Sequence, residues 1–214
     1  MEKIVIWGAS GHAMVVADII RQAGWYEITG FIDSLNPDRH GSEFCGARVL
    51  GGEEQLGKLL DLGIDHIIFG FGNCEARLRL SEQVKPKGFH IASAIHPRAI
   101  IAPDVTIGAG TVVMGGAVIN SGTLIGENVI VNTSASVDHE CNIGDGAHIC
   151  PGVHLAGKVT VGRGAWVGIG ATVVDHVSLG RGSLIGAGAV VVTDIPDDVI
   201  AYGNPAKVKG RSKG

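Results

Sequence analysis

The sequence is poor in aromatic residues and in cysteine. Aromatic side chains make up 5% of its 214 residues, and its four cysteines are Cys45, Cys74, Cys141 and Cys150. These cysteines do not have the close spacing of zinc ligands. We therefore expect reduced, mostly structural thiols and no bound metal, as in a cytoplasmic protein.

An excess of positive charge and a long apolar run are also absent. The formal net charge is −4 and the isoelectric point is near 6.1, which argues against a protein that binds nucleic acid or a charged membrane surface. No apolar run approaches the roughly 18 residues needed to cross a bilayer, and no charged and apolar leader opens the chain. We therefore expect no membrane insertion and a cytoplasmic location.

Glycine, in contrast, is abundant, and its 34 residues recur with a fixed period. Residues 101–196 divide into sixteen uninterrupted units of six, and every unit begins with Ile, Leu or Val. The third and fourth positions are mostly turn formers such as Gly, Asp and Asn. One branched aliphatic residue per short unit is typical of a parallel β-helix, and three units per coil predict about five coils. Each aliphatic side chain should point inward and stack on its equivalent eighteen residues later.

This repeat resembles that of the hexapeptide-repeat acyltransferases, whose β-helix is left-handed. The left hand is implied by the resemblance alone, because parallel crossover connections usually follow the right-handed rule. We therefore expect residues 98–214 to form a left-handed parallel β-helix with a C-terminal tail.

The first 95 residues have a different pattern, in which strands alternate with helices. An apolar run at residues 3–7 is typical of a strand buried on both faces. The remaining predicted elements are strands at 28–33, 66–71 and 89–95, and helices at 13–22 (ending near Gly24), 53–62 and 73–84. Such alternation indicates a small parallel, Rossmann-like α/β sheet, and we assign residues 1–97 to this domain.

One crevice of this domain is expected to bind a ligand, because parallel α/β sheets bind ligands at the carboxyl ends of their strands. The residues predicted there are Ser10, Gly11, His12, Asp33, Gly72 and Asn73. The turn at residues 8–12 lacks the third glycine of the dinucleotide fingerprint, which argues against a dinucleotide with Asp33 on its ribose. A phosphate at the helix N-terminus suits the turn, and a tight turn without a ligand is the alternative.

Together, the two halves resemble the NeuD/PglD family of bacterial acetyl-CoA-dependent acetyltransferases, which act on nucleotide-linked amino sugars or on sialic acid. The resemblance covers nearly the whole chain and is carried by the turn at residues 8–12, the hexapeptide run and the segment Asp138-His139-Glu140-Cys141. It implies that the α/β domain holds a nucleotide-sugar and that a homotrimer holds acetyl-CoA between neighbouring β-helices.

One departure from the repeat points to a catalytic site. Among the sixteen pairs at the third and fourth positions, only His139-Glu140 contains no Gly, Asn, Asp, Ser or Pro, and residues that break a local rule are expected at functional sites. A histidine can accept a proton near neutral pH, and a following carboxylate can fix its tautomer. A solvated corner with two polar residues is the alternative. The family resemblance implies that His139 is the general base and Glu140 its orienting acid.

Two further residues are implicated by the resemblance: His148 at the acetyl-bearing end of coenzyme A, and Asn132 in the substrate site. His148 follows His139 by one and a half units, so the two lie on different sides of the β-helix. A trimer could set His148 of one subunit opposite His139 of its neighbour. No cysteine lies where a covalent acyl carrier is expected, which favours direct acetyl transfer. The spacing of His139, His148 and His154 does not match that of the zinc carbonic anhydrases that share this repeat.

The remaining coenzyme contacts are expected at turn glycines and near the C-terminus. Gly157, Gly170 and Gly188 are candidates for lining the pantetheine groove, although each can also be a plain turn. The segment 202–207, which includes Pro205 and Lys207, resembles the one that closes hexapeptide acyltransferases near coenzyme A. The basic residues that could attract its phosphates are Lys207, Lys209, Arg211 and Lys213. A solvated basic tail is the alternative.

The sequence therefore predicts a trimeric, cytoplasmic N-acetyltransferase that uses acetyl-CoA and a nucleotide-linked 4-amino-4,6-dideoxy sugar, with a UDP-sugar favoured. A GDP-linked amino sugar and O-acetylation of sialic acid are alternatives within the family. A non-catalytic scaffold that binds a sugar nucleotide is an alternative of another class, and the His139-Glu140 pair argues against it.

Overall fold

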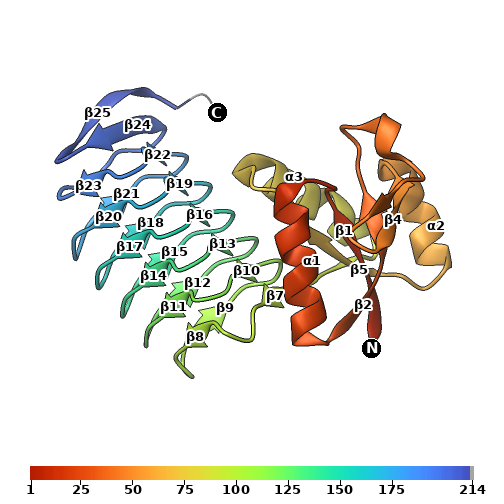
Figure 1. The fold of residues 1–214 in the computed structure, drawn as a ribbon. Coiled ribbons are helices and arrows are strands. Elements are labelled where there is room, and N and C mark those ends of the chain that lie inside the picture. The colour runs from red at the N-terminus through yellow and green to blue at the C-terminus, as the bar shows by residue number, and fades with distance from the viewer. Residues whose placement is uncertain (213–214) are drawn as a thin grey trace.

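The computed structural model describes residues 1–212, which form an α/β domain followed by a parallel β-helix (Figure 1). The predicted coenzyme contact Lys213 lies outside the described residues. The α/β domain lies beside the first coils of the β-helix, and the later coils extend past it to a C-terminal hairpin (Figure 1). Within residues 1–212, no helix has the length and apolar character needed to cross a membrane.

The α/β domain contains a six-stranded sheet with the order β3-β4-β2-β1-β5-β6. Its strands are β1 (Glu2–Trp7), β2 (Tyr26–Ile32), β3 (Glu43–Phe44), β4 (Ala47–Gly51), β5 (His66–Phe69) and β6 (His90–Ile91). The pairs are parallel, as predicted, except for the unpredicted hairpin of β3 and β4. The apolar run of β1 is buried on both faces: Ile4 and Ile6 belong to one buried cluster, and Val5 and Trp7 to another.

Helices cover both faces of this sheet. They are α1 (Gly11–Ala23), α2 (Leu56–Asp61) and α3 (Cys74–Val84), with short 3₁₀ turns η1 (Pro37–Arg39), η2 (Glu53–Gln55) and η3 (Lys85–Lys87). The predicted end of the first helix is confirmed, because Gly24 has a left-handed φ of 71° and closes α1. At the start of α3, Asn73 Oδ1 accepts a hydrogen bond of 2.8 Å from the backbone N–H of Ala76.

The β-helix is built of short strands in three parallel sheets. The first sheet contains β7 (Ala94–Ile95), β10 (Val112–Val113), β13 (Ile130–Val131), β16 (His148–Ile149), β19 (Trp166–Val167), β22 (Leu184–Ile185), β24 (Val199–Gly203) and the antiparallel β25 (Ala206–Arg211). The second contains β8 (Ile100–Ile101), β11 (Val118–Ile119), β14 (Ser136–Val137), β17 (His154–Leu155), β20 (Thr172–Val173) and β23 (Val190–Val191). The third contains β9 (Thr106–Ile107), β12 (Leu124–Ile125), β15 (Asn142–Ile143), β18 (Thr160–Val161) and β21 (Ser178–Leu179).

The predicted inward stack of aliphatic side chains is confirmed. The aliphatic residue that begins each repeat unit is the second residue of a two-residue strand. It pairs with the equivalent residue one coil later, as in the series Val131, Ile149 and Val167. These three side chains are fully buried. The first residue of each strand points to the opposite, outward face.

The single strand predicted at residues 89–95 is in fact two strands in different sheets. β6 extends the α/β sheet beside β5, whereas β7 pairs with β10 and opens the β-helix. The first strand of the β-helix therefore lies within residues 1–97. Both strands contribute buried apolar side chains. A single apolar run in the sequence is therefore compatible with either sheet and does not show where the chain passes from one to the other.

Helices α1 and α3 both pack against the β-helix. The apolar face of α1 and the first sheet form one buried cluster, which includes Val16 and Val112. α3 lies against the corners that lead from the third sheet to the first. Leu78 fills the space over Gly146 there, because a Cβ at Gly146 would lie 2.6 Å from the Leu78 side chain.

Replacing Ile149 by alanine tests the inward stack. The side chain is completely buried, so its loss should lower the free energy of unfolding by about 2–5 kcal/mol. Thr160→Ala, on the exposed outward side of β18, is the matched control and should change it by at most about 0.5 kcal/mol. Chemical denaturation measures both. Equal effects would show that the stack does not carry the stability of the β-helix.

Candidate active site

His139 and Glu140 lie at the corner between β14 in the second sheet and β15 in the third, which we call the second–third corner. Glu140 occupies the fourth repeat position, where glycine is usual, and has a left-handed φ of 58°. This conformation costs a non-glycine residue about 1–2 kcal/mol. Ser134 and Lys158, at the same position of other units, have left-handed φ values of 55° and 59°, so this conformation belongs to the turn of the repeat.

Glu140 orients the imidazole of His139. His139 Nδ1 lies 3.1 Å from Glu140 Oε2, and Lys158 Nζ lies 3.6 Å from the same oxygen. The hydrogen bond with His139 and the charge of Lys158 lower the pKa of Glu140, so its carboxylate is ionised at neutral pH. Because Glu140 occupies Nδ1, the nitrogen of His139 that is left for a substrate is Nε2. The His139 side chain is 54% exposed and therefore accessible.

Gly157 makes room for this imidazole. It lies at the same corner one coil later, and a Cβ there would lie 2.6 Å from both Cε1 and Nε2 of His139. Any side chain at this position would displace the ring. Gly157, which the sequence suggests as a lining of the coenzyme groove, thus lies directly against the candidate base.

A second cluster surrounds His148 on β16, at the boundary between the domains. His148 is 4% exposed, and its ring centre lies 4.3 Å from that of Trp166 and 6.2 Å from that of His12. Asn132 Nδ2 lies 3.1 Å from His148 Nε2, and the Gly72 carbonyl oxygen lies 3.4 Å from His148 Nδ1. The structure thus brings together four residues that were predicted for the site, two from each domain.

The hydrogen bonds define the tautomer of His148. Asn132 Oδ1 accepts a hydrogen bond of 2.8 Å from the backbone N–H of Thr133, so Asn132 presents its NH₂ group to His148. His148 Nε2 accepts this hydrogen bond, which places the ring proton on Nδ1, facing the Gly72 carbonyl. His148 is therefore a neutral donor at Nδ1.

His148, which is buried, and His12, which is half-buried, are both neutral at physiological pH. Burial, assisted by the charge of Arg77, lowers the pKa of His148 to about 3 and that of His12 to about 4. In the described part of the chain, His12 Nε2 is buried without a hydrogen-bond partner. Buried polar atoms usually have partners, so this nitrogen is an exception.

A cavity of about 370 Å³ lies at the carboxyl ends of β1, β2 and β5, where the crevice was predicted. Ser10, Asp33 and Asn73 line it. Asp33 is 5% exposed, and its Oδ1 already accepts hydrogen bonds from the backbone N–H groups of Leu35 and Asn36. Its carboxylate therefore shapes the loop after β2. The other residues predicted for the crevice, Gly11, His12 and Gly72, are not among the lining residues.

A second cavity, of about 340 Å³, lies on the first sheet beside His148. Ile169 and Ala187 line it at the corner between the first and second sheets. The next residues are the predicted groove glycines Gly170 and Gly188, which have left-handed φ values of 67° and 65° and open space in place of a side chain. This first–second corner thus offers a smooth outward surface that an extended ligand could follow from the cavity.

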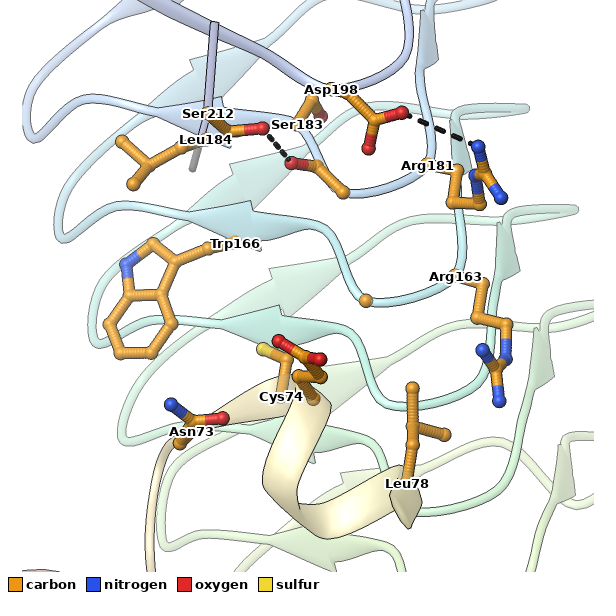
Figure 2. Close-up of a pocket in the computed structure, with 13 residues that line it drawn as sticks. Asn73, Cys74, Leu78, Arg163, Trp166, Arg181, Ser183, Leu184, Asp198 and Ser212 are labelled. Atoms are coloured by element: carbon orange, nitrogen blue, oxygen red, sulfur yellow. Dashed lines mark hydrogen bonds and ion pairs between the residues drawn. The ribbon is translucent and has the colours of Figure 1, made fainter. Parts of the chain in front are cut away.

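A third cavity, of about 520 Å³, lies between the start of α3 and the later coils (Figure 2). Figure 2 shows Arg163 and Arg181 on one side and Trp166 and Leu184 on the other. Each arginine is paired with a carboxylate. Of the predicted site residues, Asn73 lines this cavity as well.

The predicted coenzyme residues Pro205 and Lys207 lie in the C-terminal hairpin of β24 and β25, which continues the first sheet beyond β22. Lys207 is paired in register with Tyr202, and both are exposed. Lys209 Nζ lies 5.6 Å from the Tyr202 ring centre. The hairpin thus presents basic side chains at the end of the β-helix.

The described residues offer neither a reactive buried thiol nor a metal-binding group. Burial raises the pKa of Cys74 and Cys141, and raises that of Cys150 to about 12. The thiolate is the nucleophilic form of cysteine, so these residues are poor acyl carriers. Within residues 1–212, no cluster of three or more His, Cys, Asp or Glu side chains could hold a metal ion.

The coiled hexapeptide units and the histidine–glutamate corner define a hexapeptide-repeat acyltransferase. Comparison with known protein families supports this class. Residues 3–84 match the family described as PglD N-terminal domain, and residues 158–193 match the family described as Bacterial transferase hexapeptide (six repeats).

Solved structures extend the similarity over the whole chain. PerB from Caulobacter crescentus, in complex with CoA and GDP-perosamine, is 38% identical with a TM-score of 0.93, over 98% of each chain. The acetyltransferase domain of PglB from Neisseria gonorrhoeae FA1090 is 38% identical with a TM-score of 0.91, over 98% of this chain and 100% of that one. WeeI from Acinetobacter baumannii AYE shares the fold, with 24% identity and a TM-score of 0.85 over 98% and 100%.

The chain therefore belongs to the NeuD/PglD family of hexapeptide-repeat acetyltransferases. Membership confirms the predicted fold class, an α/β domain followed by a left-handed parallel β-helix. It also makes the protein an acetyl-CoA-dependent acetyltransferase.

Two residues near the site were not predicted. Trp166 follows His148 by one coil, and the two pair in register, so the repeat itself places both on one outward column. Arg77 lies on the buried face of α3, together with Cys74 and Val84. The helical spacing of Cys74, Arg77 and Val84 fits one buried face. Arginine is rarely buried, so its charge wrongly predicts an exposed position.

The neutral state of His148 makes the stability of the protein depend on pH. A histidine in the unfolded chain takes up a proton below about pH 6.5, whereas His148 stays neutral in the folded protein until the pH approaches its pKa of about 3. Between these values the unfolded state binds more protons, so the free energy of unfolding falls as the pH falls.

The variant His148→Gln should remove this contribution. Between about pH 6.5 and pH 5, its free energy of unfolding should fall less steeply than that of the wild type, by about 1.4 kcal/mol per pH unit. Chemical denaturation across this range measures the slope. His90→Gln, at an exposed histidine, is the control and should follow the wild type. An unchanged slope in His148→Gln would contradict a buried, neutral imidazole.

Proposed function

We propose that this protein transfers the acetyl group of acetyl-CoA to the amino group of a GDP-linked 4-amino-4,6-dideoxy sugar. The observation that carries the proposal is the accessible imidazole of His139, whose Nδ1 contacts the ionised Glu140 while Nε2 is left for a substrate. Further support comes from PerB, described with CoA and GDP-perosamine, and from structures of the same Caulobacter enzyme in which one histidine is replaced by asparagine or alanine.

In the proposed reaction, the sugar amine attacks the thioester carbonyl carbon, and a C–N bond forms. His139 Nε2 accepts the proton that the amine loses, and Glu140 stabilises the resulting imidazolium. The C–S bond then breaks, and the CoA thiolate leaves and takes up the proton from His139. The raised pKa values of Cys74, Cys141 and Cys150 favour this direct transfer over a covalent acyl-enzyme.

The proposed binding sites follow from the cavities. The crevice lined by Ser10, Asp33 and Asn73 is proposed to hold the nucleotide, with His12 and Gly72 at its inner end toward Asn132 and His148. The cavity beside His148 is proposed to receive the reacting end of the coenzyme. The pantetheine arm would then follow the first–second corner past Gly170 and Gly188, toward the hairpin that contains Pro205 and Lys207.

The site is proposed to lie between subunits of a homotrimer. In one chain, His139 lies at the second–third corner, whereas Asn132 and His148 lie on and beside the first sheet. These are different sides of the β-helix. A threefold arrangement can set the corner of one subunit against the first sheet of the next, because each interface of a cyclic oligomer joins two different surfaces.

The GDP-linked substrate takes the place of the UDP-sugar that the sequence favours. One reason is the complex of PerB with GDP-perosamine. The second is a residue of the crevice that suits a guanine base. Glu53 lines the crevice with a side chain that is 44% exposed; its Oε1 accepts hydrogen bonds from Gln83 and Lys87, and its Oε2 is left for a ligand. A carboxylate can accept hydrogen bonds from both N–H groups on the Watson–Crick edge of guanine, whereas uracil has one such N–H between two carbonyls.

Replacing Glu53 by glutamine tests this nucleotide preference. The wild type should have a higher kcat/KM with the GDP-sugar than with the UDP-sugar, and Glu53→Gln should reduce the ratio by about 10–100-fold, as expected for lost hydrogen bonds to a charged group. Glu82→Gln, outside the crevice on α3, is the matched control. Kinetics with both sugars measure the ratio, and an unchanged ratio in Glu53→Gln would exclude this residue from base recognition.

Replacing His139 by alanine tests the mechanism. Loss of the general base should lower kcat by about 10²–10⁴-fold, while the dissociation constant of acetyl-CoA should stay nearly constant, because the coenzyme is held elsewhere. His90→Ala, at an exposed histidine of the α/β domain, is the control and should retain activity. Steady-state kinetics and calorimetry give the two quantities. A near-normal kcat in His139→Ala would overturn the assignment of the base.

A further inference from the structure

Arg77 on α3 is a buried cation without a carboxylate partner. It is 1% exposed and is the largest fully buried side chain in the described chain. Its guanidinium donates to backbone carbonyls: Nε to Asn128 at 3.1 Å, Nη1 to Gly72 at 2.5 Å and Nη2 to Gly146 at 2.9 Å. Within residues 1–212, no ion pair of Arg77 with a carboxylate is present. A buried charge costs several kcal/mol unless hydrogen bonds satisfy it, so the carbonyls are what hold the guanidinium there.

These carbonyls belong to both domains. Gly72 lies in the loop between β5 and α3 of the α/β domain, whereas Asn128 and Gly146 lie one coil apart at the third–first corners of the β-helix. The planar guanidinium therefore ties this loop to two successive coils. The rigid fork of an arginine can direct donors to several acceptors in this way, which a lysine cannot.

The same Gly72 carbonyl reaches His148. Its oxygen accepts from Arg77 and lies 3.4 Å from His148 Nδ1. Gly72 also packs closely on the imidazole, since a Cβ there would lie 3.3 Å from His148 Cε1. The next residue, Asn73, lines the crevice proposed for the nucleotide. Arg77 is thus connected through one short loop to both the crevice and His148.

We propose that Arg77 is a positioning residue for acetyl transfer: by holding the Gly72 carbonyl against His148 Nδ1, it fixes the His148 tautomer and the placement of the nucleotide crevice relative to the acetyl-transfer site. The inference rests on the function proposed above. The positive charge also opposes protonation of His148 and His12, and lowers the pKa of both.

Other interdomain contacts do not take over this role. Lys85 pairs with Glu127, and Arg163 with Glu82, across the same boundary. All four side chains are at least 43% exposed, and exposed ion pairs contribute about 0–1 kcal/mol. They do not contact Gly72 or His148, so the removal of such a pair provides a matched control.

The first test measures the wild type and needs no variant. Histidine-selective ¹⁵N NMR reports the tautomer and charge of His148. We expect a neutral ring with the proton on Nδ1 at neutral pH. A charged ring, or a proton on Nε2, would show that the Gly72 carbonyl does not fix this histidine and would overturn the proposal.

The second test compares Arg77→Met, Arg77→Lys and the control Lys85→Met. In Arg77→Met, kcat/KM for the nucleotide-sugar should fall about 10–100-fold, since small misplacements of reacting groups can cost about 10²-fold. The dissociation constant of acetyl-CoA should change less than about threefold, and the His148 signals should lose the single Nδ1–H form. Arg77→Lys keeps the positive charge but lacks the planar guanidinium, so its kcat/KM should lie between those of Arg77→Met and the wild type. Lys85→Met should match the wild type in all three measurements.

The outcomes separate this inference from the proposed function. A folded Arg77→Met, or Arg77→Lys if the former does not fold, with normal kcat/KM and unchanged His148 signals would overturn the positioning role. A wild type that binds GDP but acetylates no sugar nucleotide would overturn the proposed function. In that case, the His148 signals and the GDP affinity of Arg77→Met, compared with those of the wild type, still decide whether Arg77 positions the loop that contains Gly72.

Discussion

The inward stack of one aliphatic side chain per hexapeptide is the constraint on which the rest of this structure depends. Because each side chain lies over its equivalent one coil away, the register of all three sheets is fixed. A residue's place in its unit then decides whether it points inward, points outward or forms a corner. The candidate functional residues take the outward and corner places, as His148 and His139 do, so their chemistry can vary without loss of the core.

The two histidines differ because their surroundings differ. His139 is accessible and is oriented by an ionised carboxylate, which suits a group that exchanges protons with a substrate. His148 is enclosed by Asn132, Gly72 and Trp166, and burial near a positive charge keeps it neutral. A neutral imidazole with one fixed donor and one fixed acceptor suits orientation. Burial and partners thus suit the same residue type to two different roles.

Much of the fold could be predicted because the sequence repeats every six residues. The aliphatic residue of each unit marks an inward position without any knowledge of distant contacts. The corner at His139 and Glu140 was also visible, since two residues there replace the usual turn formers. The contact of Gly157 with the His139 ring was not, because it joins different coils and depends on where the ring lies. The meeting of His12 with His148 depends on how the two domains pack, which no local pattern encodes. Arg77 was missed because its charge predicts exposure, whereas carbonyls from both domains make its burial possible.

The central claim is that each acetyl-transfer site joins His139 of one subunit to Asn132 and His148 of its neighbour. Co-expression of His139→Ala chains with Asn132→Ala chains tests it directly. In a trimer with shared sites, random assembly sets an intact His139 opposite an intact Asn132 at about one quarter of the sites. The mixed oligomer should therefore regain about a quarter of the wild-type activity, although each variant alone is nearly inactive. If each site forms within one chain, no site is intact, and a mixture no more active than the two separate variants would contradict the account.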